Sequence, residues 1–143
     1  MKKIIPFLFF LSLPFCSRSC PIDTISYWKV YHNNVLLKNL NDYTNNSIVI
    51  KSKNYKPGDY LAIQYFDDTP CEDCKFALIV RGEGKSEIYR SEFKGENKLI
   101  KINLKNLIDF RPKTNPSTFI IYLYELEDKN KKNGQRLITV KIE

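Results

Sequence analysis

The stretch that decides the fold covers residues 56–80 and reads KPGDYLAIQYFDDTPCEDCKFALIV. Its first four residues, 56–59, form a turn signal, because proline fixes φ and glycine accepts positive φ. Two apolar runs follow, at 60–66 and 76–80, and both are typical of strands. An acidic connector containing a Cys-x-x-Cys pair separates them. We therefore expect a central strand pair with a short covalent staple at the bend.

The rest of the chain contains further strand-like runs and little that predicts helix. The run at 76–80 lacks alternation, as expected of a strand that is buried on both faces. The spacing of the apolar residues within 104–108 predicts one helical turn. Further short apolar or alternating runs lie at 25–32, 35–38, 47–51, 86–93, 99–103, 118–126 and 136–142, with turn residues between them.

These patterns predict an all-β protein: a two-sheet antiparallel β-sandwich of about eight strands in an immunoglobulin-like layout. A small β-barrel is the alternative. The chain has 143 residues, with 43% hydrophobic and 27% charged residues, which suits a single globular domain. We place that domain at residues 25–143.

The first 19 residues have the pattern of a secretory signal peptide. Lys2 and Lys3 precede an apolar run at 4–15 that is too short to span a bilayer comfortably. Small residues, Ser17 and Ser19, lie just before Cys20. In these features the segment resembles a bacterial lipoprotein signal, and the resemblance covers residues 1–20 alone.

The resemblance implies cleavage before Cys20, lipidation of that cysteine and a tether at residues 20–24. We therefore expect an exported protein that is lipid-anchored in the cell envelope and contacts the membrane through its N-terminal lipid. Cys16 is the rival lipidation site. A soluble periplasmic or secreted protein and an uncleaved leader that anchors the chain are further alternatives.

The charge of the chain does not point to nucleic acid. The formal charge is +7, and removing residues 1–19 leaves 20 basic against 16 acidic residues, about +4. Lys129, Lys131 and Lys132 form the one tight basic group. Nucleic-acid binding requires a clustered basic footprint, so we expect no nucleic-acid partner.

Cys71 and Cys74 are predicted to form a structural disulfide at the bend. A catalytic Cys-x-x-Cys uses a helix N-terminus to lower the thiol pKa, whereas a strand-like run follows this one and carboxylates flank it. The alternative function is a thiol-redox or metal-handling envelope factor that uses this pair. Zinc would need more Cys or His ligands, and DDTPCEDC does not match a calcium loop. We therefore assign no metal or cofactor.

Catalytic signatures are sparse in this sequence. His32 is the only histidine, and no nucleophile elbow or phosphate-binding glycine loop is present. We assign no catalytic residue. An envelope enzyme that uses His32 with acidic residues is a second rival, and it predicts a concave pocket at His32.

Tyrosines supply the candidate binding surface, because five of them fall opposite the core residues of their strands. Exposed tyrosines offer a large contact area with a polar tip, suited to an unknown protein or glycan partner. The candidates are Tyr27, Tyr31, Tyr60, Tyr122 and Tyr124. The alternative is ordinary cross-strand packing. The sequence thus favours a non-catalytic binding or accessory module held at an envelope surface.

Overall fold

The structure is a computed structural model that describes residues 25–82, 86–110, 117–127 and 134–143. The predicted signal peptide, the predicted tether and both candidate lipidation sites, Cys16 and Cys20, lie outside the described residues. So do the basic group at 129–132 and residues 111–116.

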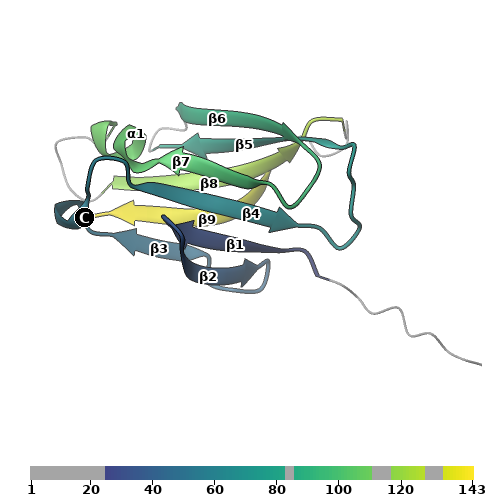
Figure 1. Cartoon of the computed structure of the whole chain (residues 1–143), viewed down its shortest axis with the longest axis horizontal. Coiled ribbons are helices and arrows are strands. Elements are labelled where there is room, and N and C mark those ends of the chain that lie inside the picture. Colours follow the sequence, from purple (N-terminus) through teal and green to yellow (C-terminus); the bar gives the residue numbers. More distant parts are fainter. Residues whose placement is uncertain (1–24, 83–85, 111–116, 128–133) are drawn as a thin grey trace, which may run out of the picture.

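Two β-sheets form the molecule (Figure 1). The four-stranded sheet has the order β2-β1-β4-β7, and the five-stranded sheet has the order β3-β9-β8-β5-β6. The strands are β1 (Tyr27–His32), β2 (Val35–Asn41), β3 (Ser47–Ile50), β4 (Tyr60–Phe66), β5 (Lys75–Arg81), β6 (Glu87–Lys94), β7 (Leu99–Asn103), β8 (Ser117–Glu125) and β9 (Gln135–Ile142).

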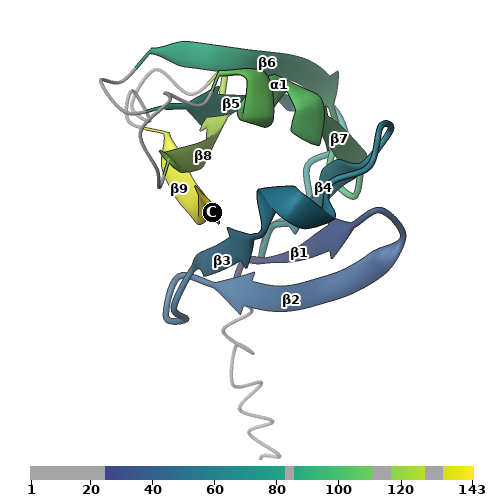
Figure 2. The same ribbon diagram turned by 90° about the vertical axis from the view of Figure 1, so that its left-hand side faces the viewer.

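The predicted β-sandwich is confirmed, and the sheets do not close into a barrel. Figure 2 shows the two layers facing each other. Among the described residues, six of the seven strand pairs are antiparallel. The seventh is parallel: β3 crosses from the β1–β2 hairpin to the opposite sheet and runs alongside the last strand, β9.

The strand order follows the immunoglobulin-like layout. The neighbouring strands β1-β4-β7 correspond to strands A, B and E of that layout, and β9-β8-β5-β6 correspond to G, F, C and C′. β2 is added outside the first strand as a hairpin partner. The described cysteines form a bridge within one loop, whereas antibody domains join their two sheets with a disulfide.

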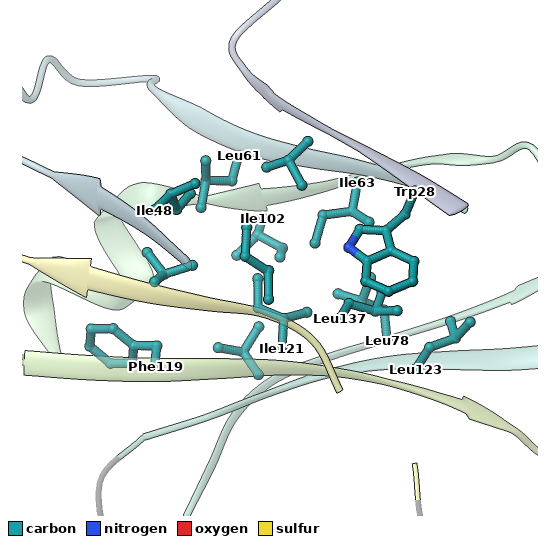
Figure 3. Packing of buried hydrophobic residues seen from close by; sticks show 14 of the residues in the cluster. Trp28, Ile48, Leu61, Ile63, Leu78, Ile102, Phe119, Ile121, Leu123 and Leu137 are labelled. Carbon is teal, nitrogen blue, oxygen red and sulfur yellow. The ribbon is translucent and has the colours of Figure 1, made fainter. Parts of the chain in front are cut away.

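The core lies between the two sheets and centres on large side chains from both. Trp28, on β1, is fully buried. Figure 3 shows its indole projecting toward Leu78 and Leu137 of the opposite sheet. The indole Nε1 makes no hydrogen bond within the described residues, so Trp28 contributes mainly through its packing.

β5 is buried on both faces, as its unbroken apolar run predicts. Phe76, Leu78 and Val80 join the core, while Ala77 and Ile79 point to the outer face and are buried there too. β8 and β6 flank β5 on its two sides. A central position in the sheet therefore accounts for the absence of polar residues between Phe76 and Val80.

The structure differs from the sequence expectations at a few element boundaries. Nine strands are present in the described residues, and β2 extends to Asn41, beyond the predicted 35–38. The predicted helical turn is α1 (Leu104–Asp109), whose first turn is capped by the Asn103 side chain. A 3₁₀ turn, η1 (Ser52–Asn54), was not expected. No helix in the described residues is long and apolar enough to cross a membrane.

Candidate functional site

Three of the five candidate tyrosines lie on one surface, the outer face of the four-stranded sheet. Tyr27 and Tyr31 alternate with the buried residues of β1, and Tyr60 does so on β4. The strand register places Tyr27 opposite Phe66 and Tyr31 opposite Ala62. We call this surface the aromatic face; it also includes Lys29, Gln64 and Lys101.

The aromatic rings of this face are paired with each other and with lysines. The Tyr27 and Phe66 rings are stacked, with centroids 4.5 Å apart, and the Lys29 ammonium lies 5.2 Å from the Phe66 centroid. The Lys101 ammonium lies 4.5 Å from the centroid of Tyr60. Such cation–π contacts hold a lysine against a ring while its charge remains available.

Hydrogen bonds fix the remaining side chains of the face. The Tyr60 hydroxyl donates to Asn34 Oδ1 at 2.9 Å, and the Tyr31 hydroxyl approaches Gln64 Oε1 at 3.4 Å. Ala62 points outward between these groups but is fully buried. Each of the three tyrosines therefore also makes a cross-strand contact of the kind expected of ordinary packing.

None of the four strands of this sheet contains an Asp or Glu residue. Its ionisable side chains are those of lysines, tyrosines and His32. Lys29 and Lys101 place positive charge on the aromatic face, whereas Asp42, Asp67 and Asp68 follow directly after the ends of β2 and β4. Phe66, Lys29 and Lys101 were not predicted as site residues, although the lack of acidic residues in these runs can be read from the sequence.

Tyr122 and Tyr124 lie on the opposite side of the molecule, on the outer face of the five-stranded sheet. Both rings contact Arg81, whose guanidinium carbon lies 5.4 Å from the Tyr122 centroid and 5.6 Å from the Tyr124 centroid. The Tyr124 ring also covers Gly134 and leaves no room there for a side chain. The five tyrosines thus occupy two separate faces and do not form one surface.

The Cys71 and Cys74 side chains form a disulfide in the loop between β4 and β5, with their Cα atoms 5.5 Å apart. Strand β5 begins at Lys75, so no helix N-terminus faces the sulfur atoms. The Cys74 amide donates to Cys71 Sγ at 3.2 Å. The arrangement pins a bend between two strands, and it lacks the helix dipole that activates a redox cysteine.

Glu96, in the turn between β6 and β7, holds this loop from outside. One carboxylate oxygen accepts the Cys71 N–H at 2.7 Å, and the other accepts the Asp67 N–H at 3.0 Å. The Gly95 N–H also donates to the Cys74 carbonyl at 2.9 Å. Gly95 has a φ of +72°, and a Cβ there would lie 2.8 Å from the Glu72 carbonyl oxygen. No local sequence pattern predicts this contact between two distant loops.

His32 borders a hollow, as the rival enzyme hypothesis predicts. The hollow has a volume of about 380 Å³ and lies between the free edges of the two sheets. Most of its wall is apolar. The lining residues are His32, Leu37, Val49, Ile50, Lys51, Asn54, Tyr55, Asp59 and Leu104.

The polar pair in this hollow is better suited to structure than to catalysis. His32 Nε2 lies 3.8 Å from Asp59 Oδ2 and makes no hydrogen bond within the described residues. Asp59 instead accepts the Lys56 backbone N–H at 2.8 Å and the Asn33 side-chain N–H at 3.1 Å. These hydrogen bonds, the first one most, together with His32 lower the pKa of Asp59 below its ordinary value. The lining residues include no serine, cysteine or threonine that His32 could activate.

The carboxylates around the disulfide loop do not assemble into a cation site. Asp67 accepts hydrogen bonds from the Ser26 hydroxyl and the Asp68 amide, both at 2.8 Å. Asp73 instead pairs with Lys94 at 2.7 Å. In the part of the chain that the structure describes, no group of three or more His, Cys, Asp or Glu residues is arranged to hold a metal ion.

No protein-family model matches this chain, and comparisons with curated proteins and with solved structures find no match either.

Proposed function

We propose that this protein is a non-catalytic binding module of the bacterial cell envelope, anchored by a lipid on Cys20, and that the aromatic face binds its partner. One observation carries the proposal: tyrosines and cation–π-paired lysines share a face on a sheet whose strands contain no acidic residue. Tyrosine is enriched at protein–protein interfaces relative to the rest of the protein surface. The two lysines on the face favour an acidic partner.

The ring geometry favours a protein partner over a glycan. A sugar stacks on an open aromatic ring face. Here Phe66 lies against Tyr27 and beneath Lys29, while Lys101 covers one side of the Tyr60 ring. The half-exposed Tyr27 and the two ammonium groups remain for a partner, and the ammonium groups suit the carboxylates of a protein.

The thiol-redox or metal-handling alternative has less support. The Cys71–Cys74 bridge lies before a strand, and Glu96 fixes its loop by two hydrogen bonds. An exchanging disulfide would have to open this clamped loop. The His32 enzyme hypothesis has its predicted pocket but lacks a nucleophile in the lining residues.

The proposal is tested by purifying the affinity-tagged protein from its native membranes, together with the variant Lys29→Glu/Lys101→Glu. We expect the wild-type chain to begin at an acylated Cys20 in an intact-mass measurement and to bring down a discrete acidic protein. The double charge reversal should abolish that co-purification, because it replaces attraction with repulsion. The matched control is Lys94→Glu/Lys141→Glu, which changes the net charge equally at two exposed positions of the five-stranded sheet.

Three results would each overturn a different part of the proposal. A chain that retains residues 1–19, or lacks the acyl mass, would remove the lipid anchor. Equal co-purification with both double variants would remove the aromatic face as the binding surface. Recovery of a glycan in place of a protein would reject the protein partner.

A further inference from the structure

A second surface, separate from the aromatic face, lies where the free edges of the two sheets meet. β2 is the outermost strand of the four-stranded sheet and β3 is the outermost strand of the five-stranded sheet. Figures 1 and 2 show β3 beside one end of β2, to which a short connection joins it. The Lys38 ammonium of β2 donates to the Ser47 carbonyl of β3 at 2.7 Å and so joins the two edges.

This edge is unusually apolar for a solvent-exposed strand. Val35, Leu36 and Leu37 follow one another on β2 and are 67%, 48% and 42% exposed. Val49 of β3 is 53% exposed, and it lines the His32 hollow together with Leu37. A run of exposed aliphatic residues on an open edge is a liability that most proteins avoid, and it marks a surface that another chain covers.

The usual protection of an edge strand is largely missing from β2. It contains no proline, and the charge of its one lysine is turned toward β3 and bonded there. A register shift opposite Val30 and Tyr31 bends the strand locally, but the main-chain groups along its outer edge face no strand within the described residues. These groups remain a template for an added strand.

The charges around the hollow indicate what kind of chain would add. Lys51 lines the hollow, and Lys53 and Lys56 follow within the same connection to β4. The carboxylate in the wall, Asp59, already accepts two N–H groups. A second copy of this protein would bring its own lysines against these, whereas a peptide that carries carboxylates would be attracted.

We propose that the edge of β2 binds an extended peptide of another protein by strand addition. The peptide would place aliphatic side chains at alternate positions, one of them in the His32 hollow, and acidic residues toward Lys51. The hollow of about 380 Å³ falls in the size range of protein ligand pockets. Strand addition supplies main-chain hydrogen bonds, and the hollow supplies side-chain selectivity.

The test is selection from a random heptapeptide library displayed on phage against the full chain, followed by affinity measurements on synthetic copies of the selected peptides. We expect enriched peptides to alternate aliphatic residues and to contain Asp or Glu. Leu37→Asp should weaken their binding about tenfold or more, because it puts a charge into the apolar wall. Leu99→Asp is the matched control, since Leu99 is a similarly exposed leucine on the opposite edge strand, β7.

The outcomes separate this site from the aromatic face and from self-association. Lys29→Glu/Lys101→Glu should leave peptide binding intact. If Leu37→Asp does not fold, Val49→Asp probes the same wall from β3. The inference is overturned if the folded protein enriches no peptide, or if Leu99→Asp weakens peptide binding as much as Leu37→Asp does. It is also overturned if the protein is a dimer in solution that Leu37→Asp dissociates.

Discussion

At the scale of single residues, the alternation of apolar and polar residues along each strand predicted which side chains are buried. The buried positions of β1 and β8 agree with that alternation, and those of β4 agree except at Ala62, which points outward but is buried. Side-chain partners did not follow from it, because they depend on the register between strands. The Tyr27–Phe66 stack and the Lys101–Tyr60 pair each join residues far apart in the chain.

Asp59 provides a prediction about pH. Its carboxylate is stabilised by N–H donors in the folded state, so its folded pKa lies below the ordinary value of 3.8. The group therefore stabilises the fold above pH 3.8, and that contribution is lost as the pH falls through the lower, folded pKa. Asp59→Asn should lower the thermal midpoint at pH 7, and the difference from wild type should shrink below pH 3.8.

Fluorescence of Trp28, the single tryptophan, reports unfolding in this experiment. Asp73→Asn serves as the control, because Asp73 is highly exposed and pairs with Lys94 at the surface, where ion pairs contribute little. A constant difference between Asp59→Asn and wild type from pH 7 to pH 2 would contradict the assigned role of the carboxylate.

At the scale of elements, the sequence predicted the strands better than the contacts between loops. Turn residues marked the ends of most strands, but β2 continued through Asn39, Leu40 and Asn41 because Leu40 packs into the core. The clamp on the disulfide loop depends on Glu96, which lies 25 residues from Cys71 in the chain. Local patterns carry no information on such a pairing.

Glu96 and the disulfide should stabilise the same loop. The loop closed by Cys71–Cys74 is short, so its removal in Cys71→Ser/Cys74→Ser should cost about 2 kcal/mol of the free energy of unfolding. Glu96→Ala leaves two N–H groups without their acceptor and should cost about 1–3 kcal/mol. In combination the two changes should cost less than their sum, because each frees the loop that the other holds.

Denaturant unfolding of the four proteins in this cycle measures the coupling. Glu92→Ala, an exposed glutamate on β6 that pairs with Arg90, is the control and should change stability by less than about 0.5 kcal/mol. Strict additivity of Glu96→Ala and the cysteine changes would show that they act on independent parts of the molecule.

At the scale of the whole molecule, the fold class was predictable and the arrangement of surfaces was not. Short strands, turn spacing and the near absence of helix indicated a sandwich. The sequence did not show that the first three tyrosines would lie on one sheet and the last two on the other. Nor did it show that the edges of β2 and β3 would meet around His32, because both facts depend on how the strands are distributed between the sheets.

Photo-crosslinking in intact cells is the most direct test of whether the aromatic face binds a protein partner. A photoreactive phenylalanine derivative is placed at Tyr31 on the aromatic face, at Tyr122 on the opposite face, and at Tyr43, which is 83% exposed and controls for accessibility. We predict a discrete protein adduct from position 31 and none from positions 122 and 43. Adducts of equal yield at all three positions, or a discrete adduct from position 122 alone, would contradict it.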